Sequence, residues 1–326
     1  MRRPVAHPGG NADDAATFRE QQAPGAGAVC SNRAWCVLRP LHESRRLRGP
    51  ALAATLLALA SSAQAATCPI GSAFEYLGKN VLQAEAGQPW LFVTADKLVD
   101  ADGAPNAYSP EDLFTGCPHT GVGLDCLDSA GYPDDDWWPN VLARDPDDPE
   151  KPYVQTDGPY RGYFVSMTSL RNPDYAGRLS PASYVDAARI PYLVLPAPLH
   201  ASEGMGRTGD LGYALDLASG RSTPFVIADE GPVEPLGEAS VAFWRALSSV
   251  APNARDGSGL TPDPVAIVVF PGSGAVSPLD WPIRLTALQS AADAQLAAFG
   301  GLAALRTCAD LAQQAPVPAA EATTRD

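Results

Sequence analysis

The stretch PFVIADEGPVEPLGEAS, residues 224–240, joins an apolar run to a helical run through a turn rich in Gly and Pro. The run PFVIAD (224–229) has the length and composition of a buried strand, and it ends on Asp229. The run EASVAFWRALSSV (238–250) begins with Glu238 and has the apolar spacing of a helix. The stretch therefore predicts a strand, a turn and a helix, with one isolated carboxylate on each side of the turn.

The rest of the chain has the composition of a β-rich fold, because 32 Pro and 29 Gly divide it into short apolar pieces bounded by turn residues. Six strands of this length would suit a small barrel. We therefore expect an α+β fold, mainly β, built on a six-stranded barrel. Besides 224–229, the expected strands are PWLFVTAD (89–96), RGYFVSMTS (161–169), IPYLVLP (190–196), LGYALDL (211–217) and PVAIVVF (264–270).

Two further runs predict helices. SPASYVDAAR (180–189) opens with a capping Ser and a Pro in the first turn, and IRLTALQSAADAQLAAFGG (283–301) is amphipathic and ends at a Gly pair. The acidic, Pro-rich section 125–157 is too irregular for either element, so we expect a surface excursion there.

An export segment precedes the domain. Residues 45–66, RRLRGPALAATLLALASSAQAA, combine a basic patch, an apolar run of about ten residues and small residues, so we expect a secretory signal cleaved after Ala65. Residues 1–44 read as an over-extended gene start or a disordered leader. The chain then divides into 1–65 (extension and signal), 66–314 (catalytic domain) and 315–326 (disordered tail).

Four cysteines follow the signal, at positions 68, 117, 126 and 308, and an even set in an exported protein favours disulfides. Three pairings are possible, one of which joins 117 to 126 and 68 to 308. We expect no zinc site, because the spacing lacks a Cys-x-x-Cys pair and only His119 and His200 follow the signal.

The charge of the chain limits its partners. The formal net charge of −14 becomes −18 without residues 1–65, since that segment holds eight Arg and four acidic residues. Nucleic acid is a poor partner for such a surface, whereas a polycation is attracted to it. The apolar run is too short for a membrane span, so we expect no membrane association of the mature form. We expect a secreted monomer.

The sequence lacks the residue spacing of several motifs that bind a cofactor or hold a nucleophile. VDADGAPNAYSPED (99–112) offers Asp100 and Asp102 to a calcium loop, but Ala104 and Pro105 replace a ligand and the turn Gly. These two aspartates either form a turn or line a cleft. FPGSGAVS (270–277) lacks the spacing of a phosphate loop and the context of a serine nucleophile. We expect no metal and no cofactor.

Paired carboxylates remain, and glycoside hydrolysis needs two, one protonated and one ionised. Burial at a strand end would raise the pKa of Asp229, while a helix N-terminus would keep Glu238 ionised, so we assign Asp229 as general acid and Glu238 as general base. The alternative is that the two residues only start a turn and complement a helix end. Trp137 and Trp138 could stack on sugar rings, or could anchor the loop.

The order of segments resembles the chitosanases of glycoside hydrolase family seventy-five. The likeness spans about residues 90 to 275, and IADEGPVEPLGEAS (227–240) resembles that family's Gly-Asp-x-Gly-Pro and Gly-Glu-x-Ser signature, with Ala228 at its first Gly. The other matching segments are VDADGAPNAYSPED (99–112), GYFVSMTSL (162–170), YVDAARIPYLVLP (184–196), TGDLGYALD (208–216) and PVAIVVFPGSG (264–274). The strand-turn-helix pattern also resembles double-psi β-barrels.

This resemblance implies a secreted endo-chitosanase that hydrolyses β-1,4 links between glucosamine units with inversion, with Asp229 and Glu238 as its catalytic pair. Cationic chitosan would be the partner. The matching segments and the aromatic cluster supply the expected substrate-binding residues, which are Asp100, Asp102, Tyr184, Arg207, Asp210, Glu230, Trp137 and Trp138. The rival functions are a non-catalytic carbohydrate-binding or cell-wall module and a hydrolase of another polysaccharide.

Overall fold

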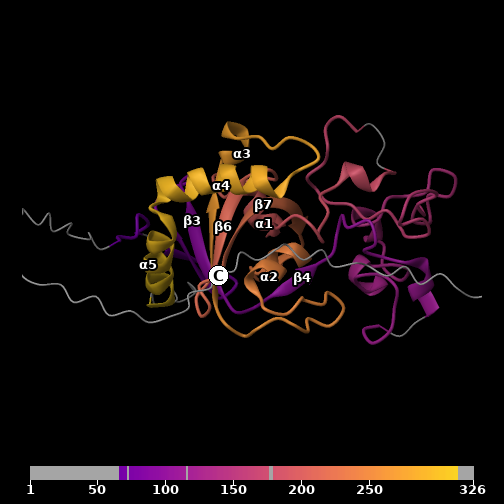
Figure 1. Cartoon of the computed structure of the whole chain (residues 1–326), viewed down its shortest axis with the longest axis horizontal. Coiled ribbons are helices and arrows are strands. Elements are labelled where there is room, and N and C mark those ends of the chain that lie inside the picture. Colours follow the sequence, from indigo (N-terminus) through magenta and orange to yellow (C-terminus); the bar gives the residue numbers. More distant parts are fainter. Residues whose placement is uncertain (1–65, 72, 115–116, 176–178, 315–326) are drawn as a thin grey trace, which may run out of the picture. The chain divides into compact units, whose positions relative to one another are not determined.

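The computed structural model describes residues 66–71, 73–114, 117–175 and 179–314, which belong to one compact unit. The predicted extension and signal (1–65) and the predicted tail (315–326) lie outside the described residues. Nine strands form one sheet (Figure 1). They are β1 (Ala73–Tyr76), β2 (Lys79–Gln83), β3 (Trp90–Thr94), β4 (Leu98–Asp100), β5 (Tyr192–Pro196), β6 (Leu211–Asp216), β7 (Ser222–Gly231), β8 (Glu238–Ser240) and β9 (Val265–Phe270).

The strand order is β1-β2-β3-β9-β6-β7-β5-β8-β4, and the sheet is mixed because β5 pairs parallel to β7 and β4 pairs parallel to β8. An α+β fold is therefore confirmed. The six-stranded, double-psi-like barrel is not, because no pairing among the described strands joins β1 to β4 and the sheet stays open. Four short strands that the sequence analysis did not predict, β1, β2, β4 and β8, extend the two edges of the sheet.

Five of the six predicted strands form, as β3, β5, β6, β7 and β9. The exception is RGYFVSMTS (161–169), which makes only isolated bridges from Phe164 to Val154 and from Ser166 to Leu142. Its neighbours in the 142–160 region are rich in Pro, which lacks the N–H that a continuous ladder needs.

The helices are α1 (Ala197–Ala201), α2 (Val241–Leu247), α3 (Ser273–Val276), α4 (Leu285–Phe299) and α5 (Gly301–Gln314). The prediction of a helix at 283–301 is confirmed by α4, which ends at Gly300 in the left-handed conformation. The helix predicted at 238–250 begins only at Val241, because Glu238–Ser240 pair with β4 as β8 and the Ser240 side chain caps the helix by accepting from Phe243 N.

The helix predicted at 180–189 is reduced to a single 3-10 turn, Pro181–Ser183. Tyr184 is extended and pairs with Arg171, and the side chain of Asp186 accepts a hydrogen bond from Ala188 N. Tertiary pairing and a local side-chain turn therefore outweigh the helical propensity of this run.

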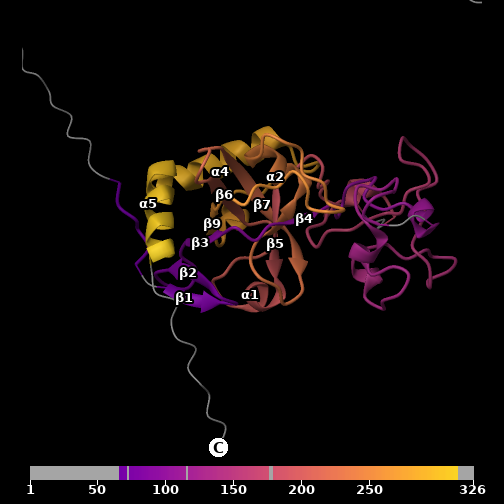
Figure 2. The same cartoon turned by 90° about the horizontal axis from the view of Figure 1, so that it is seen from below.

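The core has a layer on each face of the sheet. One layer includes Leu288 and Leu296 of α4 together with Leu305 of α5, and the other includes Phe243 and Trp244 of α2. The segment 101–175 has no regular strand and lies beside the sheet beyond β4 in both views (Figures 1 and 2). The prediction of an irregular section at 125–157 is confirmed, although Trp138 and Leu142 give it a buried interior of its own.

Two disulfides close the fold. Cys68 pairs with Cys308, with their Cα atoms 4.8 Å apart, and Cys117 pairs with Cys126, with their Cα atoms 5.8 Å apart. Of the three possible pairings this is the one that combines a short loop with a bridge across the whole domain. No helix among the described residues is long and apolar enough to cross a membrane.

Candidate active site

Four adjacent strands, in the order β7-β5-β8-β4, carry the carboxylates of the candidate site. Asp229 lies near the end of β7, Glu238 opens β8 and Asp100 ends β4. Between β7 and β8, strand β5 contributes Tyr192. Residues from distant parts of the sequence thus meet because their strands are neighbours in one sheet.

A β-bulge sets the direction of Asp229. In the pairing of β5 with β7, Leu193 faces Ile227 but Val194 faces Asp229, so Ala228 is an extra residue on β7. A bulge shifts the alternation of side chains by one and re-aims the next residue. The carbonyl of Ala228 accepts a hydrogen bond from Leu170 N at 2.8 Å, which brings the 168–170 segment against the strand.

Asp229 is held on one of its oxygens. Its Oδ1 accepts hydrogen bonds from Ser169 Oγ at 2.6 Å, from Ser169 N at 3.0 Å and from Glu230 N at 2.8 Å. Burial and the negative charge of Asp100 raise the pKa of Asp229 to about 7, although these hydrogen bonds favour the ionised form. Near neutral pH this carboxyl can therefore both take up and release a proton.

Asp100 and Asp102 form the turn that the sequence suggested and also belong to the carboxylate cluster. Asp100 Oδ1 accepts from Asp102 N at 2.7 Å, while Asp102 Oδ1 accepts from the hydroxyls of Tyr108 at 2.8 Å and Ser166 at 3.2 Å. One oxygen from each of Asp100, Asp102 and Asp229 lies within 4.8 Å of the others. Burial raises the pKa of Asp100 to about 6, and burial together with the charge of Asp100 raises the pKa of Asp102 well above its usual value.

The surroundings of Glu238 differ from those that the sequence predicted. It lies in a strand, two residues before the helix cap Ser240, so no helix N-terminus stabilises its ionised form. Among the described residues no donor bonds its carboxyl, and burial followed by the charge of Asp100 raises its pKa well above the usual value. The protonated form of Glu238 is thus favoured, which reverses the predicted direction.

Glycines allow Glu238 to reach this position. Gly237 has φ 142, and a Cβ there would lie 2.0 Å from the carbonyl oxygen of Asp96. A Cβ on Gly231 would lie 3.1 Å from Glu238 Oε2, so the end of β7 and the start of β8 pack closely. The glycines at the two ends of the turn therefore let the start of β8 pack closely against the end of β7 and against Asp96.

Three site residues were not found from the sequence. The Tyr192 hydroxyl lies 2.9 Å from Asp100 Oδ2, and Tyr108 donates to Asp102. Asp125 is 4% exposed, burial and the charge of Asp100 raise its pKa to about 7, and its own charge acts on Asp102 and Glu238. The only sequence signal for Asp125 was its place beside Cys126 at the start of the acidic section.

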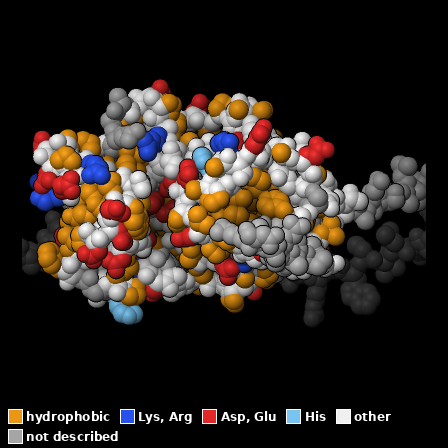
Figure 3. Space-filling model, turned by 180° about the vertical axis from the view of Figure 1, so that it is seen from behind, with side chains coloured by type: hydrophobic (Ala, Val, Ile, Leu, Met, Phe, Trp, Pro, Cys, Tyr) orange, Lys and Arg blue, Asp and Glu red, His pale blue; other side chains and the backbone are white. Residues whose placement is uncertain are grey.

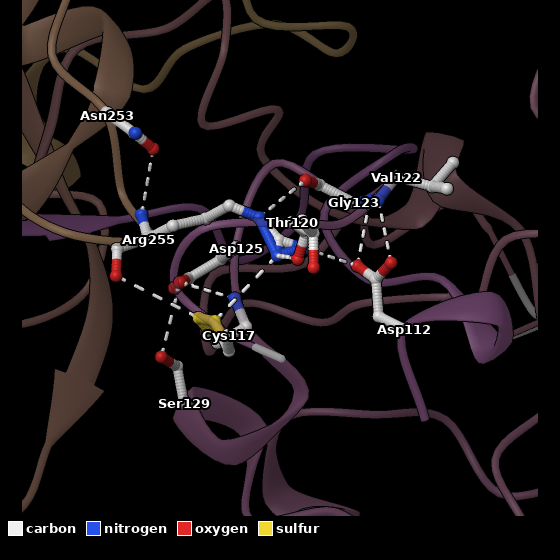
Figure 4. Close-up of a disulfide and its surroundings, with 10 residues drawn as sticks. Asp112, Cys117, Thr120, Val122, Gly123, Asp125, Ser129, Asn253 and Arg255 are labelled. Carbon is white, nitrogen blue, oxygen red and sulfur yellow. Dashed lines mark hydrogen bonds and ion pairs between the residues drawn. A yellow bond between two sulfur atoms is a disulfide. The ribbon is translucent and has the colours of Figure 1, made fainter. Parts of the chain in front are cut away.

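The side chain of Asp125 is held in place by hydrogen bonds beside a disulfide (Figure 4). Its Oδ1 accepts from Cys126 N at 2.6 Å and from Ser129 Oγ at 3.2 Å, and Cys126 is held by the disulfide to Cys117. Arg255, from the loop after α2, donates to the carbonyls of Gly123 and Thr120 on the same segment. The irregular segment is therefore tied both to itself and to the sheet domain.

The cluster offers few ligands to a calcium ion. One oxygen each from Asp100, Asp102 and Asp229 could face the same ion, whereas calcium takes six to eight oxygen ligands. Both oxygens of Asp100 and the Oδ1 atoms of Asp102 and Asp229 also accept hydrogen bonds within the protein.

Other predicted substrate-binding residues are placed elsewhere. Glu230 Oε2 pairs with His200 Nδ1 of α1 at 3.1 Å, and Asp210 accepts from the backbone N–H groups of Arg207, Gly272 and Gly274. The guanidinium of Arg207 donates to the carbonyls of His200 and Gly206. Their described contacts hold turns and a helix, and the structure does not bring them into the carboxylate cluster.

The predicted aromatic residues also have structural contacts. Trp138 is buried, lies edge-on to Tyr132 with ring centroids 5.6 Å apart, and has the guanidinium of Arg144 over its ring. Trp137 packs against Gly131 but is 40% exposed, so it remains accessible to a ligand.

The molecular surface has acidic side chains in a hollow between two lobes (Figure 3). Asp102, Asp229 and Glu238 are each partly exposed, so the carboxylate cluster is open to solvent. A separate cavity of about 660 Å³ is lined by Trp281, Arg189 and Arg284 among others, and Tyr184 is the only predicted site residue on its wall.

Comparison with known proteins gives no assignment. No protein-family model matches the chain, and no curated protein matches it either.

Proposed function

We propose that this protein is a secreted endo-acting chitosanase that hydrolyses β-1,4 glucosamine links by an inverting mechanism with two carboxylates. The observation that carries the proposal is that Asp229 and Glu238, from the two halves of the 227–240 stretch, are both partly exposed acids, that the charge of Asp100 acts on both, and that the charge of Asp229 acts on Glu238. Glycoside hydrolysis needs one protonated and one ionised carboxyl, and carboxyls with raised pKa values suit a proton donor at working pH.

The roles of the two residues follow from their surroundings. Burial and the charge of Asp100 raise the pKa of Glu238 well above its usual value, and no donor among the described residues bonds its carboxyl, so it holds its proton and serves as the general acid. Asp229 has three donors on Oδ1 that favour its ionised form, so it activates water as the general base. This assignment reverses the one drawn from the sequence.

The acidic surface supports a cationic substrate. Chitosan carries ammonium groups, and the formal net charge of −14 attracts such a polymer over long range. The two disulfides and the signal-like run at 45–66 support export. The chemistry requires no cofactor, because proton transfer and water attack are both supplied by side chains.

The test is the loss of viscosity of a chitosan solution incubated with the purified full chain. Asp229→Asn and Glu238→Gln should each lower the rate by about 10² to 10⁴ fold. Glu230→Gln is the matched control, because it removes a neighbouring carboxylate that faces His200, and it should keep most of the activity. Binding of chitosan without any cleavage by the wild type would instead indicate a carbohydrate-binding module, and equal cleavage of an uncharged glucan would indicate another substrate.

The stereochemistry of the product provides an independent test. Proton NMR during the first minutes of hydrolysis should show the α anomer at the new reducing end, as expected for inversion of a β link. The β anomer would indicate a covalent intermediate and would contradict the proposed role of Asp229.

A further inference from the structure

The proposed roles of Asp229 and Glu238 leave the buried Asp100 without a function, although it lies in the same cluster. We propose that Asp100 is a positioning residue, which acts on Asp229 and Glu238 through its fixed charge and does not touch the sugar. The inference rests on the proposed function, because it assigns a role within that reaction.

The contacts of Asp100 exclude it from binding a sugar directly. The residue is 7% exposed, and both of its oxygens have partners within the protein. Oδ1 accepts from Asp102 N at 2.7 Å, and Oδ2 lies 2.9 Å from the hydroxyl of Tyr192. A hydroxyl or ammonium group of the substrate would have to displace one of these partners.

The sheet places Asp100 beside both members of the proposed catalytic pair. It ends β4, which pairs with β8, where Leu98 faces Glu238 and Asp100 faces Ser240. Its side chain meets Tyr192 of β5, the strand on the far side of β8, and one of its oxygens lies within 4.8 Å of an Asp229 oxygen. The hydrogen bond between Asp100 of β4 and Tyr192 of β5 thus crosses β8, the strand that carries Glu238.

The electrostatics agree with this geometry. Burial is the largest cause that raises the pKa of Asp229 and of Glu238. The negative charge of Asp100 is the next largest cause that raises the pKa of both residues. The pKa of Asp100 itself rises only to about 6, since its two hydrogen bonds favour the ionised form. The other titratable groups that interact with the cluster are Asp102, Asp125, Glu234, Tyr108 and Tyr192.

The two hydrogen bonds to Asp100 favour its ionised form, and its negative charge then opposes the ionisation of Asp229 and Glu238. The general acid consequently keeps its proton at a pH where an isolated glutamic acid would have lost it. The charge of Asp100 therefore sets the pH range in which Glu238 can protonate the leaving group.

Asp100→Asn is a suitable variant because it removes the charge and can keep the contacts. The Asn oxygen can still accept from Asp102 N, and its amide can donate to the Tyr192 hydroxyl. That hydroxyl can in turn donate to the carbonyl of Asp102, which is also 2.9 Å away. The matched control is Asp125→Asn, which removes a carboxylate that is also buried. Of the four charges that raise the pKa of Glu238, that of Asp125 has the smallest effect.

The measurement is an NMR titration of the full chain labelled with ¹³C at the glutamate carboxyl, in which Glu238→Gln identifies the signal. Asp100→Asn should lower the pKa of Glu238 by about one unit or more, and Asp125→Asn by less. An equal or larger change in Asp125→Asn, or no change in Asp100→Asn, would overturn the proposal. If Asp100→Asn does not fold, the unmodified protein with ¹³C-labelled aspartate decides, because Asp100 must ionise at lower pH than Glu238.

Kinetics separate this inference from the proposed function. For an active chitosanase, Asp100→Asn should move both limbs of the pH profile of kcat/KM to lower pH. Above the alkaline limb, the rate should fall about tenfold for every pH unit by which that limb moves. Unmoved limbs with a lower maximum would indicate a direct or merely structural role and would contradict the inference. The NMR titration needs no activity, so it remains valid even for a protein that does not cleave chitosan.

Discussion

Nη2 of Arg255 lies 2.5 Å from Oδ2 of Asp112, and the two side chains are 8% and 3% exposed. The pair joins the loop after α2 to the irregular segment, since Asp112 also accepts hydrogen bonds from Val122 N at 2.6 Å and Gly123 N at 2.9 Å. Asp125 lies two residues further along the chain. A buried ion pair outside the cluster thereby fixes one of the acids within it.

Removal of Arg255 should destabilise the protein strongly. Arg255→Ala leaves the buried carboxylate of Asp112 without its cation, which costs about 3 to 5 kcal/mol in the free energy of unfolding. Lys151→Ala is the control, because its pair with Asp148 is exposed to solvent and should contribute little to stability. Urea unfolding of both variants measures the difference, and similar midpoints would contradict the importance of the buried pair.

The two disulfides should differ in their effect on stability. Cys68 and Cys308 are 240 residues apart and Cys117 and Cys126 are 9 apart, so loop closure predicts about 5 and about 3 kcal/mol respectively. The Cys68→Ser/Cys308→Ser variant should therefore have the lower Tm in calorimetry. A lower Tm for Cys117→Ser/Cys126→Ser would show that local packing near Asp125 outweighs chain entropy.

The carboxylate cluster should make the protein more stable in mild acid than in alkali. The folded-state pKa values of Asp100, Asp125 and Asp229 are about 6, 7 and 7, above the value near 3.8 of an unfolded aspartate. The folded state consequently binds more protons between about pH 4 and pH 7, and its stability falls as the pH rises through this range. Tm should be higher at pH 5 than at pH 8, with a smaller difference in Asp229→Asn; a higher Tm at pH 8 would contradict this.

Ser169 should set the acidic limb of the activity profile. Ser169→Ala removes the hydroxyl donor 2.6 Å from Asp229 Oδ1 but keeps the backbone donor. The pKa of Asp229 should then rise by about one unit, which moves the acidic limb of chitosan hydrolysis to higher pH. Ser180→Ala removes a hydroxyl that caps a 3-10 turn, so its profile should match the wild type. An unmoved limb in Ser169→Ala would indicate that Asp229 is not the base.

Local sequence was enough to predict those strands and helices whose conformation does not change when they pack in the fold. The runs that became β3, β5, β6, β7 and β9 are apolar along their length, and α4 has both an apolar stripe and a terminal glycine pair. The same reasoning failed at 180–189 and 238–240, where a bridge from Tyr184 and the pairing of β8 with β4 compete with helix formation. Propensity is a weak preference, and pairing with a distant strand is stronger.

The sequence by itself determined the strand that carries Asp229, the turn after it, the acidic charge and a cysteine set that permits two disulfides. For Asp100 and Asp102 the sequence left a turn and a cleft both open, and tertiary structure showed that they form the turn and also lie beside Asp229. Tertiary structure alone added Asp125 and decided that Glu230, Asp210 and Arg207 hold turns instead. The physical reason is that a pKa depends on burial and on neighbouring charges. Both are set by the order of strands in the sheet, which residue spacing along the chain does not encode.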